Sequence, residues 1–97
     1  MKLSTFVRPE AQTDIREATL WYESRGTGLG LRFVGEVRTA LRLIANNPLR
    51  FPAMDDEVRR ALLKSFPYAV YFLMETEVVV IAVLHQHRHP QSWQMRR

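Results

Sequence analysis

Apolar side chains recur at helical spacing in the first half of the chain. One set predicts a helix that begins at Pro9, ends near Arg25 and buries Ala11, Ile15, Ala18 and Tyr22. A second set predicts a helix that begins within residues 27–29 and stops at Asn46-Asn47-Pro48, with a stripe formed by Phe33, Val37, Ala40, Leu41 and Ile44. The link between them is short, so we expect an antiparallel hairpin.

The hydrophobic period shortens from about 3.6 residues to 2 after a loop over residues 47–57. Runs of branched and aromatic residues predict strands over residues 2–7, 59–65, 68–74 and 78–85. A polar turn, Glu75-Thr76-Glu77, joins the last two as a hairpin. The order predicts an α+β fold of two layers, with a strand, an antiparallel helical hairpin and a three-stranded antiparallel meander in one domain over residues 1–97.

Residues 78–84 read Val-Val-Val-Ile-Ala-Val-Leu and are apolar at every position. A strand with one face in water alternates between apolar and polar residues, and this one does not. The predicted hairpin can cover only one of its faces. The other face requires the C-terminal tail, through Trp93 and Met95, or a second copy of the chain, or another protein.

The charge balance is basic. Fourteen Lys and Arg residues oppose ten Asp and Glu residues, which gives a net charge of +4 and a pI near 10.1. All but Lys2 and Lys64 of these cations are Arg, which forms planar, bidentate contacts with carboxylates and phosphates. The sequence therefore predicts an acidic partner, either a nucleic acid or a protein. A solvated basic surface that aids solubility is the alternative interpretation.

Several classes of protein are disfavoured by what the sequence lacks. There is no Cys, so neither disulfides nor thiol chemistry is available, which fits a reducing cytoplasm. No apolar run approaches the roughly 20 residues that span a bilayer. The first residues do not resemble a signal peptide. We therefore expect a cytoplasmic protein with no membrane association.

Six short segments, spread over nearly the whole chain, carry a family resemblance. They are Trp21-Tyr22-Glu23, Gly28-Leu29-Gly30-x-x-Phe33, Asn47-Pro48-x-x-Phe51-Pro52, Arg59-Arg60-x-Leu62, Phe66-Pro67-Tyr68-x-Val70-Tyr71 and Leu84-His85-x-x-Arg88-x-Pro90-x-x-Trp93. Together and in this order they resemble the ParE-like, plasmid-stabilisation branch of the RelE/ParE superfamily of bacterial toxins. The resemblance implies the same strand, hairpin and sheet, and it implies the toxin of a type II toxin–antitoxin module.

The resemblance also implies a set of partners and no cofactor. A cognate acidic antitoxin would neutralise the toxin. The expected assembly is either a homodimer of the toxin or a toxin–antitoxin hetero-oligomer. Some members of the superfamily inhibit DNA gyrase without cleaving nucleic acid, whereas others cleave mRNA on the ribosome. A simple DNA- or RNA-binding module is a third reading, but the chain has no recognition-helix pattern and no interleaved surface aromatics.

Metal-free RNA cleavage requires a base, an acid and cations around one phosphate. The candidates are Arg59, Arg60, Lys64, His85 and Arg88, and we expect Arg60 and Lys64 on one side of their strand, converging with His85 and Arg88 at one edge of the sheet. The ribonucleases of the family commonly carry a C-terminal Tyr, and this chain has none after residue 71. The departure favours a non-enzymatic inhibitor, with target or partner contacts at Arg59, Arg60, His85, Arg88 and Trp93.

Two further groups of residues have competing interpretations. His85, His87 and His89 alternate and could face one way, but Pro90 restricts the last and no Cys or carboxylate completes a ligand set, so we expect no metal. His85 alone is also interpreted as a structural residue, hydrogen-bonded at a strand end. In the helical hairpin, Trp21, Tyr22 and Phe33 are expected to pack in the core. The alternative is a target-facing helix surface formed by the Glu17–Trp21 and Arg16–Glu23 region.

Overall fold

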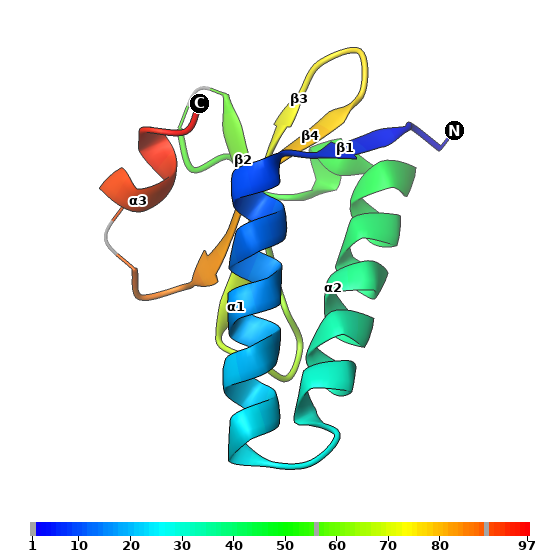
Figure 1. The fold of residues 1–97 in the computed structure, drawn as a ribbon. Coiled ribbons are helices and arrows are strands. Elements are labelled where there is room, and N and C mark those ends of the chain that lie inside the picture. The colour runs from blue at the N-terminus through cyan, green and yellow to red at the C-terminus, as the bar shows by residue number, and fades with distance from the viewer. Residues whose placement is uncertain (1, 56, 89) are drawn as a thin grey trace.

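The fold was described from a computed structural model over residues 2–55, 57–88 and 90–97. Its elements are β1 (Thr5–Val7), α1 (Pro9–Arg25), α2 (Leu29–Asn46), the short 3-10 helix η1 (Pro48–Arg50), β2 (Val58–Leu62), β3 (Tyr68–Met74), β4 (Val78–His85) and α3 (Gln91–Gln94). The two long helices lie side by side as a hairpin against the sheet (Figure 1). The predicted α+β class and helical hairpin are confirmed.

The sheet contains four strands in the order β1-β4-β3-β2. The meander from β2 to β4 is antiparallel, as predicted, and β1 adds a fourth strand because it pairs parallel with β4 through Phe6 and Val79. The strand predicted over residues 59–65 ends earlier, at Leu62. Lys64 therefore lies in the turn after β2, and the expectation that a strand aligns it with Arg60 is wrong.

Each face of the sheet carries its own apolar cluster. On the inner face, the hairpin packs against the sheet through buried side chains that include Phe33, Ile44, Val70, Phe72 and Val80. On the outer face, a second cluster includes Val58, Tyr71, Leu73, Ile81, Leu84 and Trp93. The two-sided apolar pattern of β4 therefore reflects burial on both faces.

A bulge explains why two neighbouring residues of β4 share the outer face. Tyr71 pairs with Ala82 while Phe72 pairs with Val80, so Ile81 is the extra residue in the ladder. A bulge shifts the alternation of side chains by one position. Ile81 and Ala82 consequently both belong to the outer cluster.

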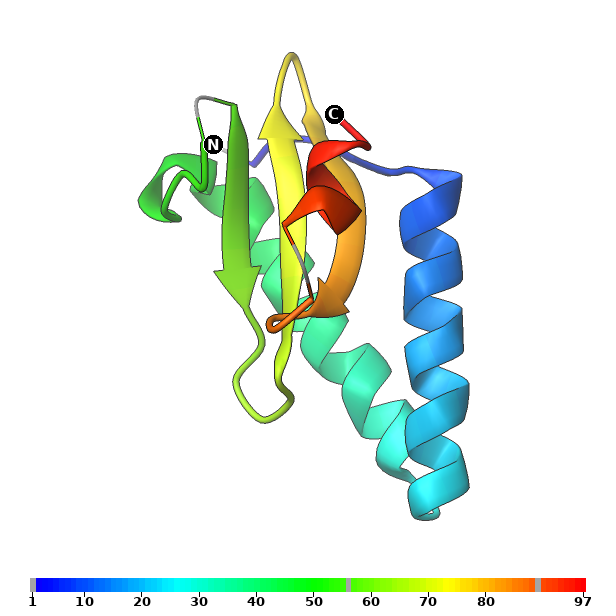
Figure 2. The same cartoon turned by 90° about the vertical axis from the view of Figure 1, so that its left-hand side faces the viewer.

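The outer face is covered by the C-terminal residues 90–97, which we name the strap. Figure 2 shows α3, within the strap, on the opposite side of the sheet from the hairpin. The ring of Trp93 stacks on Tyr71 with centroids 5.2 Å apart and an interplanar angle of 15°. The tail therefore covers the outer face through Trp93, as predicted. The same prediction is wrong for Met95, which is 86% exposed.

Ionic contacts hold the strap at both sides of the sheet. Arg96 forms an ion pair with Asp14 of α1 and also donates to the carbonyl oxygen of Ile81. Arg97 forms ion pairs with Asp55 and Glu57, in the segment that precedes β2. The strap therefore crosses the sheet from α1 to the start of β2.

The link between the helices is set by two features of α1 and α2. Gly28 has a φ of 88°, in the left-handed region that favours glycine. The carboxylate of Glu23 accepts hydrogen bonds from the backbone N–H groups of Gly28 and Gly30, which are otherwise unpaired at the start of α2.

Among the described residues, no helix combines the length and the hydropathy that crossing a bilayer requires.

Candidate functional site

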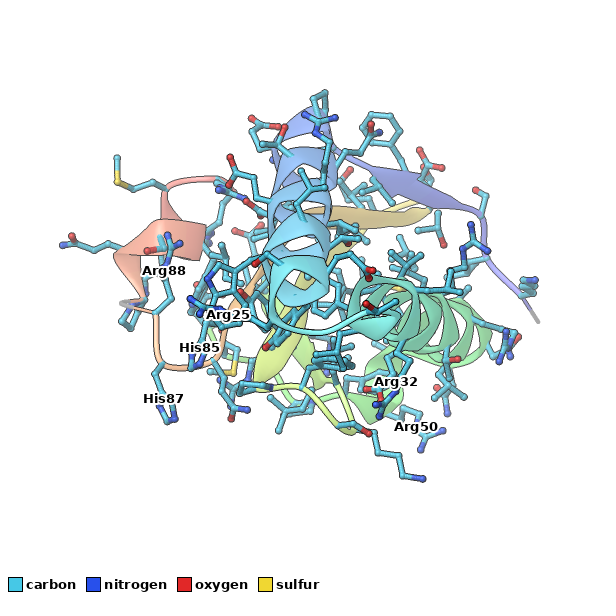
Figure 3. The ribbon with its side chains drawn as sticks, turned by 60° about the horizontal axis from the view of Figure 1, so that its bottom comes forward. Arg25, Arg32, Arg50, His85, His87 and Arg88 are labelled. Carbon is cyan, nitrogen blue, oxygen red and sulfur yellow. The ribbon has the colours of Figure 1, made fainter. Side chains whose placement is uncertain are left out.

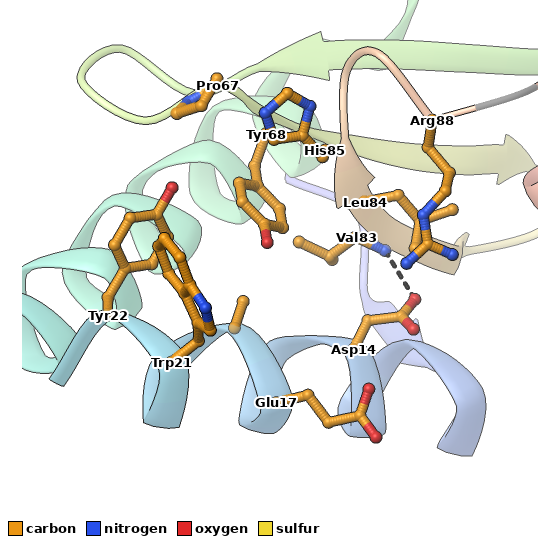
Figure 4. Close-up of a pocket in the computed structure, with 11 residues that line it drawn as sticks. Asp14, Glu17, Trp21, Tyr22, Pro67, Tyr68, Val83, Leu84, His85 and Arg88 are labelled. Carbon is orange, nitrogen blue, oxygen red and sulfur yellow. Dashed lines mark hydrogen bonds between the residues drawn. The ribbon is translucent and has the colours of Figure 1, made fainter. Parts of the chain in front are cut away.

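A groove of about 460 Å³ opens between α1 and the ends of β3 and β4 (Figure 4). Its walls combine apolar, aromatic and charged side chains. From α1 come Asp14, Glu17, Ala18, Trp21 and Tyr22; the sheet and its flanking loops supply Pro67, Tyr68, Val83, Leu84, His85 and Arg88. Its size is that of a site for a small molecule or for a few protein side chains.

Aromatic rings form a continuous wall of the groove. Tyr22 contacts Trp21 edge to face at 5.0 Å between centroids, and Tyr68 lies 5.9 Å from Tyr22 and 5.6 Å from His85. Trp21 is 50% exposed, so its predicted place in the core is wrong, whereas Phe33 is fully buried and Tyr22 is partly buried. The reason is the direction of the side chains, since consecutive helical residues point about 100° apart: Tyr22 packs against Phe33 and Tyr68, and Trp21 lies in the groove wall.

The two phenols of the groove are hydrogen-bond donors at neutral pH. Burial raises the pKa of Tyr68; the carboxylate of Asp14 also raises it, while the charge of Arg88 lowers it. Burial, together with Tyr68, raises the pKa of Tyr22. Both side chains therefore stay protonated well above neutral pH.

The charged residues lie on opposite sides of the groove. Figure 4 places Asp14 and Glu17 along α1, with His85 and Arg88 across from them. Asp14 accepts the backbone N–H of Val83 at 3.0 Å and pairs with Arg96 of the strap. This carboxylate thus occupies the edge of β4 where β1 has ended.

His85 is fixed by a bond within its own turn. Its Nδ1 accepts the backbone N–H of His87 at 3.1 Å, so the neutral ring carries its proton on Nε2. This contact agrees with the structural interpretation of His85 as a hydrogen-bonded residue at a strand end. His89 lies outside the described residues, and within the rest no group of three His, Asp or Glu side chains is arranged to hold a metal.

The structure separates the other predicted cations from His85 and Arg88, which line the groove. Arg60 pairs with Tyr71 and shares its outer face, whereas the guanidinium of Arg59 donates to the carbonyl of Phe51 and lines a smaller hollow with Glu57. Successive residues of a strand point to opposite faces. Neither Arg60 nor Lys64 lines the groove, so the predicted convergence with His85 and Arg88 is wrong. Trp93, within the strap, is buried against the outer face.

Sequence reasoning missed Tyr68 as a neighbour of His85. The two residues are paired in the ladder between β3 and β4. Counting outward from the predicted turn at residues 75–77 brings them within one residue of each other, and the bulge at Ile81 supplies the remaining shift. The alternative of a target-facing surface at Glu17 and Trp21 stayed open in the sequence, because nothing in the helical pattern distinguishes a groove wall from a solvated face.

The fold of the described residues, a helical hairpin on one face of a four-stranded sheet, has a counterpart among solved structures. A solved structure titled "Chromosomal ParDE TA system from P. aeruginosa" matches with a TM-score of 0.76 and 16% identity, covering 87% of this chain and 96% of that chain. At this identity the likeness establishes the fold. No match was found among curated proteins.

The sequence profile of one family gives the more specific assignment. The profile, described as "ParE toxin of type II toxin-antitoxin system, parDE", matches residues 6–90. The chain therefore belongs to the ParE toxin family and is a ParE-type toxin of a type II toxin–antitoxin system. Such a system implies a cognate antitoxin as partner.

Proposed function

We propose that this toxin arrests growth by binding a core replication target such as DNA gyrase, without cleaving nucleic acid, and that an acidic antitoxin neutralises it. The observation that carries the proposal is the composition of the groove. Of the five candidate residues, all of them described, only His85 and Arg88 line it. Metal-free RNA cleavage depends on cations that stabilise the charge on the reacting phosphate, and Arg88 is the one Lys or Arg among these candidates that lines the groove.

The protonation states in the groove also favour binding over cleavage. Nδ1 of His85 is already an acceptor, so neutral His85 presents an N–H and not a basic nitrogen to the groove. Tyr22 and Tyr68 keep their protons because their pKa values are raised. The carboxylates along α1 place negative charge where an RNA phosphate would need cations.

The same residues suit a protein target. Trp, Tyr and Arg are the residue types that most often dominate binding energy at protein interfaces. Here Trp21 is half-exposed, the protonated phenols of Tyr22 and Tyr68 can donate hydrogen bonds and Arg88 can pair with a carboxylate. The groove thus offers an apolar anchor site beside a charge-assisted contact.

A ribosome-dependent mRNA endoribonuclease is the second candidate function. One observation favours it: the phenol ring of Tyr68 lies beside His85, with Arg88 in the same groove. A protonated Tyr68 could act as the acid that the sequence alone did not supply. This reading then makes His85 indispensable, which separates it from the inhibitor.

The test compares induced toxins in bacterial cells. We expect wild type to block replication, with filamentation and an SOS response before translation falls. Arg88→Ala should weaken toxicity, because a charge contact buried at the interface contributes about 2–5 kcal/mol. Arg60→Ala, which removes a cation from the outer face, is the matched control, and His85→Gln should retain most toxicity.

The opposite pattern is distinct. Rapid loss of protein synthesis, new 5′ ends within translated codons and loss of toxicity in His85→Gln would establish the ribonuclease instead. Neutralisation is tested separately, by co-expression with the protein encoded by the neighbouring reading frame. If no acidic protein from that frame raises the solubility or the melting temperature of the toxin, the proposed neutralisation is wrong.

A further inference from the structure

The solvent face of α2 lies apart from the groove. In Figure 3, Arg32 projects from α2 on the side away from His85, His87 and Arg88. The buried face of α2 carries Phe33, Val37, Ala40 and Ile44. Its exposed positions are Leu31, Arg32, Gly35, Arg38, Thr39, Arg42, Leu43 and Asn46.

This exposed face is basic and partly apolar. All of α2 is described, and none of its exposed side chains is acidic. Glu36, the acid of the helix, is turned to the backbone N–H of Ser65, which it accepts at 2.8 Å. Within the described part of the chain, neither Arg38 nor Arg42 forms an ion pair. Leu31, nearer the start of the helix, is 79% exposed.

Gly35 occupies the middle of the same face. A glycine inside a helix costs about 1 kcal/mol relative to Ala, so it needs a reason. A Cβ at Gly35 would meet no atom within 4 Å, so packing inside this molecule does not require the glycine. An open strip without a side chain lets the backbone of another helix approach closely.

The spacing aligns these features. Leu31, Gly35, Arg38 and Arg42 follow one another at intervals of four, three and four residues, which keeps them on one line along the helix. With a rise of 1.5 Å per residue, the line is about 16 Å long. It therefore matches roughly three turns of a second helix.

We propose that the solvent face of α2 docks an acidic amphipathic helix of the cognate antitoxin. Carboxylates of that helix pair with Arg38 and Arg42, an apolar side chain covers Leu31, and the two backbones approach at Gly35. The exposed leucine and the glycine favour a helix over a phosphate backbone, since phosphates need neither. The inference rests on the proposed neutralisation by an acidic antitoxin and assigns it a place.

The experiment measures the affinity of purified toxin variants for the protein encoded by the neighbouring reading frame. Arg42→Glu and Arg38→Glu should each raise Kd at least about tenfold, because each reversal sets like charges against each other. Gly35→Gln should raise the melting temperature of the toxin and still raise Kd, so its weaker binding cannot come from unfolding. Arg16→Glu, an equal charge change on exposed α1, is the control and should leave Kd nearly unchanged.

Each other outcome is decisive. If wild type binds tightly and the three α2 variants bind equally well, the α2 site is wrong while neutralisation stands. If wild type does not bind at all, the proposed neutralisation fails first. A DNA duplex of about two turns is the second probe. Binding of that duplex that is lost in Arg38→Glu and Arg42→Glu but kept in Gly35→Gln would make the face a phosphate site and overturn the proposal.

Discussion

The two tryptophans of the chain lie on opposite sides of the same pair of strands and have opposite environments. Trp93, on the outer face, is 4% exposed and stacks on Tyr71. Trp21, at the groove, is 50% exposed, with the guanidinium of Arg25 over its ring at 4.6 Å. The chain itself closes the outer face at Trp93, whereas the groove at Trp21 remains accessible.

The difference lies in what covers each region. The outer face has the strap, which ion pairs attach to α1 and to the segment before β2. The groove lies between α1 and residues of β3 and β4, and Trp21 in its wall stays half-exposed. A large aromatic side chain therefore stabilises the fold at Trp93, whereas at Trp21 it is available to a partner.

The largest expected effect comes from opening the closed face. Trp93→Ala removes the stack on Tyr71 and exposes part of the outer cluster, so we expect a loss of about 3–5 kcal/mol in the free energy of unfolding. Urea denaturation measures it. Met95→Ala, two residues away and exposed, is the control. Equal stability of the two variants would show that the strap does not hold the outer face.

The next effect distinguishes the two ends of the strap. Arg96→Ala leaves Asp14, whose side chain is 9% exposed, without its cation, and also removes a donor from Ile81. A hydrogen bond to a charged group contributes about 1.5–3 kcal/mol, so a loss in that range is expected. Arg97 is more exposed, and Arg97→Ala should cost less than about 1 kcal/mol. Thermal unfolding of both variants compares them, and the reverse order would contradict the assignment.

The open region should show the reverse balance between stability and activity. The side chain of Trp21 buries less apolar area than that of Trp93. We therefore expect Trp21→Ala to lower the free energy of unfolding by only about 1 kcal/mol. Toxicity should fall strongly if the groove binds the target. Growth inhibition, measured beside the melting temperature of the purified variant, separates the two. Unchanged toxicity in a well-folded Trp21→Ala toxin would remove the groove from the proposed function.

Local pattern predicted the helices well because their stripes are complete. The sequence placed α1 at its observed bounds, and the stops at Gly26 and Asn47-Pro48 depend only on neighbouring residues. The parallel pairing of β1 with β4 was not predicted, since it joins residues more than 70 positions apart. The bulge at Ile81 was missed too, because an apolar residue fits either face of a buried strand.

The candidate site was predicted in part for the same physical reason. His85 is the last residue of β4 and Arg88 follows it by three residues, so their proximity is local. Arg60 depended on which face of β2 it occupies, and Lys64 on where β2 ends. Trp21 could not be distinguished from Trp93, since a sequence gives the size of an apolar side chain but not the extent of the layer beside it.

The smallest expected effect concerns pH and the segment to which the strap is attached. The backbone N–H of Val58 donates to Asp55 and lowers its pKa; burial opposes this, and the N–H of Glu57 and the charge of Arg97 add to the lowering. A carboxyl group with a folded pKa below its unfolded value, about 3.9 for Asp, stabilises the fold above that unfolded value. The contribution is lost as pH falls through the folded pKa.

Asp55→Asn keeps an oxygen for the N–H of Val58 but removes the charge that faces Arg97. We therefore expect the variant to be slightly less stable than wild type near neutral pH. The difference should shrink as pH falls from about 4, the unfolded pKa of Asp, through the lower folded pKa of Asp55, below which the wild-type side chain is also neutral. Chemical denaturation at a series of pH values measures it, with Glu75→Gln as a control that removes one carboxylate from the turn between β3 and β4. A stability difference that stays constant down to low pH would mean that the amide disturbs the local backbone, and that the charge of Asp55 contributes nothing to holding the strap.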